Sequence, residues 1–217
     1  MRFRDRAEAG QRLARALADL DLESPVVLAL PRGGVPVGLE VARLLQAPLD
    51  VLVARKIGAP GQPELGIGAI AEGGGIVMDG EAVRALGVSD ALFDRLAEAA
   101  RDELDRRVQR YRGGRPLPTL EGRDVVLVDD GLATGVTAEA ALHALRGRRP
   151  HRVVLSVPVG APETVARLRD LAVEVVCIEE PSPFGSVGRF YERFDQTSDD
   201  EVMGLLAESA DWSEAAP

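Results

Sequence analysis

The sequence has very little cysteine and histidine, and it has no long apolar run. Of its 217 residues, one is cysteine and two are histidine. A single cysteine excludes an internal disulfide framework and fits a reducing compartment. His143 and His151 share no metal-ligand spacing. No apolar run approaches the roughly 20 residues of a membrane span, and the opening MRFRDRAEAG lacks the apolar segment of a secretory signal. We therefore expect a cytoplasmic protein without a membrane partner.

Positive charge is also scarce. Against 35 Asp and Glu stand 26 Lys and Arg, which gives a net charge of −9, and Lys56 is the only lysine. This balance argues against non-specific nucleic-acid binding, which needs a basic surface. A local basic pocket for a phosphate is still compatible with it. The hydrophobic share of 46% is typical of a globular fold, and the length predicts one domain over residues 1–217.

Apolar residues alternate between strand-like runs and helix-like stripes. Short runs rich in Val, Leu and Ile predict buried strands, and stripes at three- and four-residue spacing predict helices. The predicted helices cover residues 3–20, 36–46, 89–113, 137–145 and 162–171, and the main strands cover 26–30, 49–54, 124–128, 152–157 and 173–178. Shorter strands are predicted within 67–78, a loop over 57–66 and a frayed acidic tail from about 205. This alternation predicts a parallel α/β sheet with right-handed crossovers.

The most informative segment is VVLVDDGLATGVT, residues 125–137. A buried strand ends in two adjacent carboxylates, Asp129 and Asp130, and a short loop then supplies Thr134, Gly135 and Thr137 before a helix begins. Free N–H groups and the dipole at a helix start favour an anion such as phosphate. The two carboxylates would repel a phosphate, but they suit ribose hydroxyls or a divalent cation. Phosphate beside paired hydroxyls is typical of a ribose 5-phosphate.

This segment resembles the phosphoribosyl pyrophosphate (PRPP) motif of the type I phosphoribosyltransferases. The resemblance implies that Asp129 and Asp130 hold the ribose hydroxyls. It also implies that the 5-phosphate is bound by the loop residues Ala133, Thr134, Gly135, Val136 and Thr137. Many members of that family have a second glycine where Val136 stands. The alternative is an ordinary capped helix that follows a strand with two solvated aspartates.

Leu30-Pro31-Arg32-Gly33-Gly34 resembles the pyrophosphate loop of the same family. The bare backbone of Gly33 and Gly34 beside the Arg32 guanidinium suits a pyrophosphate. The resemblance implies a cis peptide bond between Pro31 and Arg32. A plain strand-to-helix turn is the alternative.

Arg55 and Lys56 end the second predicted strand. They look like the Arg-Lys pair that contacts pyrophosphate in adenine-type phosphoribosyltransferases, although a solvated strand end would show the same residues. The predicted loop 57–66 resembles the flexible loop that closes over the family's active site, where closure excludes water. Glu64 is its charged residue and a candidate general base. The sequence does not determine whether this loop closes.

Aromatic residues make up 4% of the chain, and four of them cluster near one another: Phe184, Phe190, Tyr191 and Phe194. A flat base needs a stacking surface, so Phe184 and Tyr191 are the base-binding candidates. In the family, terminal segments form a hood over the base. The resemblance therefore implies a hood built from residues 181–200 and the N-terminal segment, where Phe3 lies among Arg2, Arg4 and Arg6. Alternatively, these rings only attach the C-terminal segment to the core.

The sequence thus predicts a type I phosphoribosyltransferase fold, with a parallel sheet of about five strands flanked by helices and a small hood. The implied activity moves 5-phosphoribosyl from PRPP to a nitrogenous base or related amine and releases pyrophosphate. Asp129, Asp130, Arg55 and Lys56 are the catalytic candidates. The family uses Mg²⁺, for which Asp129 and Asp130 are the candidate ligands, either directly or through PRPP or water. Dimers are common in the family, which makes a homodimer an expectation.

Other functions are compatible with these motifs. One is a non-catalytic regulator that binds PRPP or a nucleotide, because fold does not settle function. Another is hydrolysis or phosphorolysis of a phosphoribosyl compound. A dinucleotide-binding domain is disfavoured because no Gly-x-Gly-x-x-Gly follows the first strand. Neither the acceptor base nor the oligomeric state can be determined from the sequence.

Overall fold

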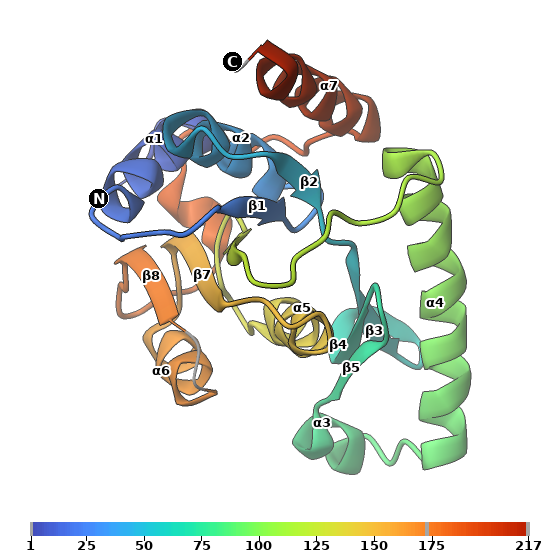
Figure 1. The fold of residues 1–217 in the computed structure, drawn as a ribbon. Coiled ribbons are helices and arrows are strands. Elements are labelled where there is room, and N and C mark those ends of the chain that lie inside the picture. Colours follow the sequence, from blue (N-terminus) through green and yellow to red (C-terminus); the bar gives the residue numbers. More distant parts are fainter. Residues whose placement is uncertain (1, 172–173, 216–217) are drawn as a thin grey trace. The chain divides into compact units, whose positions relative to one another are not determined.

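The computed structural model describes residues 2–171 and 174–215, without the side chains of residues 63, 64 and 211–215. The chain divides into two compact units (Figure 1). The first combines Met1–Val51, Leu117–Gly135 and Arg149–Pro217, and the second combines Leu52–Pro116 and Val136–Arg148. The single domain expected over residues 1–217 stays a prediction.

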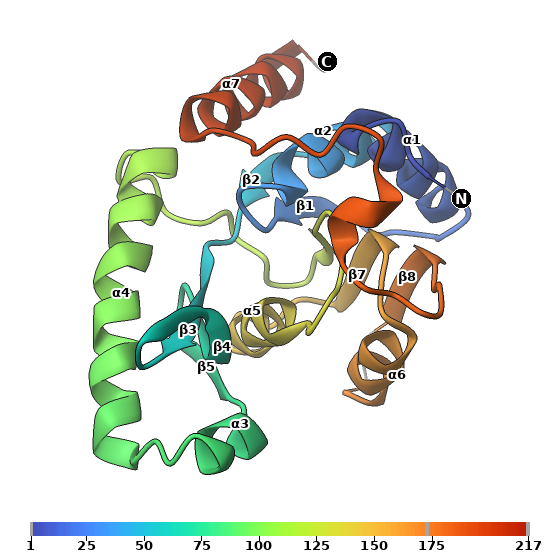
Figure 2. The same cartoon turned by 180° about the vertical axis from the view of Figure 1, so that it is seen from behind.

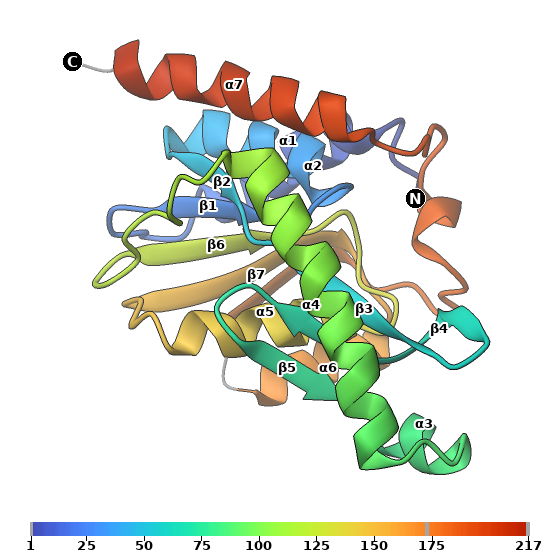
Figure 3. The same cartoon turned by 90° about the vertical axis from the view of Figure 1, so that its right-hand side faces the viewer.

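The first unit is built on a five-stranded parallel sheet with the strand order β2-β1-β6-β7-β8. Its strands are β1 (Val26–Ala29), β2 (Leu49–Val51), β6 (Asp124–Val128), β7 (Arg152–Val159) and β8 (Glu174–Glu179). Every residue of β1 and β6 is buried, as expected for continuous apolar runs in a parallel sheet. Figure 3 shows β1, β6 and β7 side by side. The parallel architecture and the predicted strands 26–30, 124–128 and 152–157 are therefore confirmed. The predicted strand 173–178 is confirmed from residue 174 onward, because residue 173 lies outside the described residues.

Helices cover this sheet. They are α1 (Arg6–Leu17), α2 (Gly34–Leu45), α6 (Pro162–Asp170) and α7 (Asp199–Ala215), with a short 3-10 turn at Val187–Phe190. The paired helices α1 and α2 lie on one face and α6 on the other (Figure 1, Figure 2). Leu13 and Leu17 of α1 pack with Val37 and Val41 of α2 against the sheet. The predicted frayed tail from about 205 was wrong, because Val202 and Leu206 are buried and the segment continues as α7, which packs on α2.

The strand order changes direction between β1 and β6. After β1 the chain proceeds to β2 at one edge of the sheet, and after β6 it proceeds to β7 and β8 toward the other edge. Ligands of open α/β sheets bind in the crevice at the carboxyl ends of the strands where such a reversal occurs. The segments that follow β1 and β6 are residues 30–34 and 129–135, so both sequence motifs lie at this reversal.

The second unit contains a three-stranded antiparallel sheet, β3-β4-β5, packed against helices. Its elements are β3 (Ala54–Ala59), β4 (Gln62–Ala71), β5 (Gly75–Met78), α3 (Gly80–Ala85), α4 (Asp90–Arg112) and α5 (Val136–Arg146). Ser89 caps α4, and Gly113 ends it in the left-handed conformation. The long α4 runs along this sheet (Figure 3). At the far end of α4, Arg112 forms a buried ion pair with Glu72.

The predicted loop over residues 57–66 was wrong. These residues form most of a β3–β4 hairpin, whose tight turn uses Gly61 at φ +73°. The register shifts near Gly58 as in a bulge. In this segment Gly61 marks the turn and Gly58 marks the irregularity in register. The residues on either side of the turn still pair as strands. The predicted strand over 49–54 is also divided, since β2 ends at Val51 and β3 begins at Ala54.

Among the described residues, no helix combines the length and the apolar character that crossing a membrane requires.

Gly10 sits where α1 crosses α2, and its replacement tests that packing. A Cβ there would lie 2.7 Å from the Val37 carbonyl oxygen and 2.9 Å from the Glu40 Cβ. Since backbone must move to relieve this overlap, we expect Gly10→Ala to lower the free energy of unfolding by about 1–3 kcal/mol. The control is Gly204→Ala in α7, where a Cβ would meet nothing within 4 Å, so helix propensity should raise stability by up to ~1 kcal/mol. Urea unfolding measures both, and equal effects would contradict the prediction.

Candidate functional site

The loops that follow β1 and β6 contact each other directly. The Leu30 N–H donates to the Val128 carbonyl at 2.8 Å. A Cβ on Gly33 would lie 1.9 Å from Asp130 Oδ2, and one on Gly34 would lie 2.7 Å from the Val128 carbonyl oxygen. A side chain at Gly34 would therefore overlap backbone, and a side chain at Gly33 would displace the Asp130 carboxylate. The peptide bond between Pro31 and Arg32 is cis, as predicted.

The two adjacent carboxylates lie at the end of β6 and have different surroundings. Asp129 Oδ1 accepts from the Asp130 N–H at 2.8 Å. Asp130 Oδ2 accepts from Arg6 Nε at 2.9 Å and pairs with Arg6 Nη2 at 2.8 Å. Burial raises the pKa of Asp130 above its ordinary value, although the Arg6 guanidinium opposes that effect. The pair therefore presents one carboxylate held by the backbone and one held by an arginine.

The loop after Asp130 has its carbonyl groups fixed by α6. The Thr164 hydroxyl donates to the Ala133 carbonyl at 2.6 Å, and Arg167 Nη2 donates to the Thr134 carbonyl at 2.8 Å. Gly135 has φ +71°, and a Cβ there would lie 2.6 Å from the Thr164 methyl group. In a trans peptide the C=O and the following N–H point in opposite directions. The N–H groups of Thr134 and Gly135 therefore point away from α6, as an anion cradle requires.

Val136 and Thr137 follow this loop as the first residues of α5 and belong to the second unit. Their N–H groups are among the first of the helix, which lack intrahelical partners. The predicted phosphate segment is thus a strand end, a loop braced by α6 and a helix start.

The basic candidates are divided between the units. Arg32 belongs to the first unit, where its Nη1 lies 3.8 Å from Asp199 Oδ1. Arg55 and Lys56 belong to β3 of the second unit. Arg55 Nη1 lies 3.8 Å from Glu103 Oε1 of α4, whereas Lys56 is exposed. Since successive strand residues point to opposite faces, these two side chains do not share a direction.

Glu64, the candidate general base, has its side chain outside the described residues.

The N-terminal segment and the aromatic segment predicted to form a hood pack on each other. The Phe3 N–H donates to the Phe190 carbonyl at 2.7 Å, and the Glu192 N–H donates to the Phe3 carbonyl at 2.8 Å. Phe3 and Tyr191 have ring centroids 5.5 Å apart. Phe184 and Tyr191 are both buried in this cluster. They therefore pack the segment onto the core, and base binding by their rings stays a prediction.

Tyr191 also supports the carboxylate segment. Its hydroxyl donates to the Asp130 carbonyl at 2.6 Å. Burial, together with the nearby Asp130 charge, raises the pKa of Tyr191 well above its ordinary value, so the hydroxyl stays a donor. Val187 of the same segment approaches Gly131, where a Cβ would lie 2.6 Å from the Val187 side chain. The aromatic segment thus contacts the residues that follow the Asp pair.

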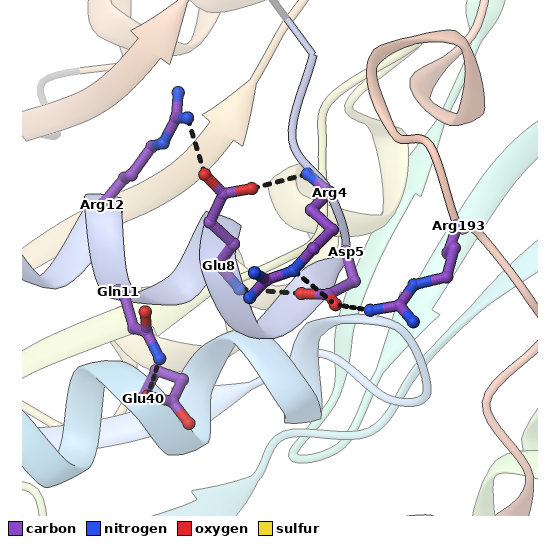
Figure 4. Close-up of polar contacts among 7 residues, drawn as sticks. All are labelled: Arg4, Asp5, Glu8, Gln11, Arg12, Glu40 and Arg193. Atoms are coloured by element: carbon purple, nitrogen blue, oxygen red, sulfur yellow. Dashed lines mark hydrogen bonds and ion pairs between the residues drawn. The ribbon is translucent and has the colours of Figure 1, made fainter.

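The start of α1 carries a network of ion pairs (Figure 4). Asp5 caps the helix by accepting from the Glu8 N–H at 3.0 Å, and it also pairs with Arg4 and Arg193. Glu8 pairs with Arg12 at 2.6 Å. Beside this network lies a pocket of about 320 Å³, lined by Asp5, Arg6, Ala7, Pro36, Arg193, Asp195, Gln196, Thr197 and Glu201.

Sequence reasoning missed Thr164 and Arg167, and it treated Arg6 only as one of several hood arginines. Thr164 and Arg167 lie at i and i+3 on α6, and no local pattern marks them as partners of a loop about 30 residues earlier. Their contribution depends on α6 folding back beside β7 and β8.

The acidic pair also fits the cation that the resemblance implies. Among the described residues, no group of three or more His, Cys, Asp or Glu side chains could hold a metal ion by itself. Mg²⁺ usually takes one or two protein carboxylates and completes its shell with waters and substrate phosphates. Asp129 and Asp130 therefore fit a Mg²⁺ that substrate helps to bind, and they do not form an all-protein cage.

Thr164→Val tests the bracing of the phosphate loop. The substitution keeps the shape but removes the hydroxyl that holds the Ala133 carbonyl. A neutral hydrogen bond contributes about 1 kcal/mol, so we expect roughly 3- to 10-fold weaker binding of inorganic phosphate by calorimetry. Thr119→Val at an exposed site is the control. Undiminished affinity in Thr164→Val would show that α6 does not brace the loop.

Comparison with known proteins agrees with this geometry. The sequence model of the phosphoribosyl transferase domain matches residues 4–193. The Mycobacterium tuberculosis (strain H37Rv) protein named "Putative phosphoribosyl transferase Rv0571c" is 50% identical over 214 residues, which are 98% of this chain and 48% of that protein. The chain thus spans about half the length of the curated relatives it matches.

Two solved structures share the fold. TT1426 from Thermus thermophilus is 50% identical, with a TM-score of 0.81 over 96% of this chain and 99% of that one. The AQ2163 protein from Aquifex aeolicus is 16% identical, with a TM-score of 0.51 over 93% of this chain and 84% of that one, and it shows likeness of fold alone. The strand order, the paired loops at its reversal and the family match together show that the chain belongs to the phosphoribosyl transferase domain family and has the type I phosphoribosyltransferase fold.

Proposed function

We propose that this protein moves the 5-phosphoribosyl group from PRPP to a nitrogen nucleophile and releases pyrophosphate. One observation carries the proposal. At the reversal between β1 and β6, the glycine loop that contains Arg32 contacts the Asp pair, and the loop braced by α6 follows that pair directly in the chain. These three parts match, in order, a pyrophosphate, a pair of ribose hydroxyls and a 5-phosphate.

The residue roles follow from the chemistry of each part. Asp129 and Asp130 accept hydrogen bonds from the ribose hydroxyls. Residues 133–137 bind the 5-phosphate through N–H groups and the hydroxyls of Thr134 and Thr137. Arg32, with the backbone of Gly33 and Gly34, binds the pyrophosphate. Arg55 and Lys56 are the further cations proposed for the departing pyrophosphate, and only one of the two would face it because neighbouring strand residues point to opposite faces.

The proposed reaction needs no covalent enzyme intermediate. The bond between the anomeric carbon and the pyrophosphate oxygen breaks, and its electron pair leaves with pyrophosphate. The acceptor nitrogen supplies the pair for the new C–N bond and then loses a proton. The protein positions the anomeric carbon and neutralises the leaving charge. When bound, Mg²⁺ would neutralise phosphate charge, and Asp129 and Asp130 would help to hold it.

The acceptor is proposed to be a small nitrogenous base or related amine that binds beneath the 181–200 segment. Val187 lies against Gly131 there, next to the Asp pair. Because Phe184 and Tyr191 are both buried, they would support the base-binding surface from the core side. We further propose that the protein works in the cytoplasm as a homodimer.

Pyrophosphate release from PRPP with Mg²⁺, measured across purine and pyrimidine bases, tests the proposed activity. We expect release with one class of base, and we expect Asp130→Asn to reduce it at least 100-fold, since Asn can donate where the ribose hydroxyl needs an acceptor. Asp102→Asn, an exposed site on α4, is the control.

The outcomes separate the alternatives. Release that is independent of any base would indicate hydrolysis. Folded protein that binds PRPP but releases no pyrophosphate with any base would overturn the transferase proposal in favour of a PRPP-binding regulator. Normal PRPP binding by Asp130→Asn would show that the ribose site is wrongly assigned.

A further inference from the structure

Arg6 is the first residue of α1, and each of its three guanidinium nitrogens has a polar partner in the first unit. Nε and Nη2 lie 2.9 and 2.8 Å from Asp130 Oδ2, and Nη1 donates to the Asp195 carbonyl at 2.7 Å. The guanidinium carbon lies 3.9 Å from the Phe194 ring centroid, which is stacking distance. The Arg6 side chain is 12% exposed. This arginine therefore joins the N-terminal helix, the Asp pair and the segment around Phe194.

The Arg6 contacts involve only one oxygen of the Asp130 carboxylate. Oδ2 receives both nitrogens of Arg6 and also lies against Gly33, where a Cβ would be 1.9 Å away. Arg6 itself makes no bond to Oδ1 of the same carboxylate. The backbone at Asp130 is held as well, because Tyr191 donates to its carbonyl at 2.6 Å. The carboxylate is thus oriented through one oxygen, and the other oxygen can accept from a ligand.

From this geometry we infer that Arg6 is a positioning residue that fixes the Asp130 carboxylate for a ribose hydroxyl. The inference rests on the proposed function, and it assigns Arg6 no contact with PRPP itself. A free aspartate samples several side-chain rotamers, and an arginine that holds one carboxylate oxygen through two nitrogens reduces that freedom before the ligand binds. Lysine cannot replace it fully, because one ammonium cannot pair with Asp130, reach the Asp195 carbonyl and stack on Phe194 at once.

The position of Arg6 is itself determined by the start of α1. Asp5 caps the helix and pairs with Arg193, which lies next to Phe194 in the chain (Figure 4). The Arg193 N–H also donates to the Arg4 carbonyl at 3.0 Å. The N-terminal segment and residues 190–195 therefore fold as one structure. Orientation of Asp130 depends on that structure being formed, which gives the N-terminal residues a role in substrate binding.

A double-mutant cycle between Arg6 and Asp130 tests the inference, with PRPP binding in the presence of Mg²⁺ measured by calorimetry on the full chain. Loss of an orienting partner typically costs 10- to 100-fold, so we expect Arg6→Met to weaken PRPP binding by that factor. Arg6→Lys should recover part of the affinity. In the Asp130→Asn background, Arg6→Met should change the affinity less than 3-fold, since the carboxylate it orients is gone.

Arg15→Met is the matched control. Arg15 lies in the last turn of the same helix and is exposed. Its PRPP affinity should stay within 3-fold of the wild type. Thermal unfolding of each variant separates a loss of fold from a loss of orientation. Should Arg6→Met not fold, the Arg6→Lys change in both backgrounds completes the same cycle.

Failure of the inference is distinguishable from failure of the proposed function. If Asp130→Asn binds PRPP normally, the ribose site itself is wrong. If Asp130→Asn loses binding while Arg6→Met binds like the wild type, only the role of Arg6 is overturned. If the two effects simply add, Arg6 does not act through Asp130, and the inference is likewise overturned.

Discussion

The close contact between the chain ends of β1 and β6 is the constraint on which the rest of the site depends. The two strands are parallel neighbours from which the chain proceeds in opposite directions, so their following loops meet over the same crevice. Gly33 and Gly34 allow that contact, since a Cβ on either would overlap Asp130 or the Val128 carbonyl. A glycine loop, two carboxylates and the loop over residues 131–135 thereby come together at the ends of two adjacent strands, and β7 supports them because the Val159 carbonyl accepts from the Leu132 N–H at 2.9 Å.

Elements around this contact hold it in a defined geometry. Helix α6 turns the carbonyls of Ala133 and Thr134 away from the crevice, and Tyr191 holds the backbone at Asp130. Arg6 holds the carboxylate itself. These supports come from three segments that are distant in sequence. Each support adds one or two hydrogen bonds. These bonds orient groups that would bind the substrate, and they do not involve the substrate itself.

Some parts of the fold and of the candidate site were predictable from the sequence, and others were not. The motif 125–137 and the loop 30–34 were predictable because strand, turn and helix-start chemistry is local, and even the cis bond after Pro31 followed from the resemblance. The hairpin at 57–66 was not predictable, because glycine and proline indicate that a turn is present but do not indicate its length. The aromatic cluster was also predictable, but the sequence left open whether its rings stack on a base or attach the segment to the core, because residues 181–194 have no period that reveals which face meets the core. The structure buries Phe184 and Tyr191.

The sequence by itself determined where most strands of the parallel sheet lie and which chemical groups follow β1 and β6. Those properties depend on apolar period, glycine, proline and capping residues within a few positions of one another. Only the tertiary structure decided that Arg6 holds Asp130, that Thr164 and Arg167 brace the phosphate loop, and that Arg55 turns toward Glu103. Such pairings join residues far apart in sequence, and they arise because chain segments brought together by core packing must satisfy their charges and hydrogen bonds with whatever lies opposite.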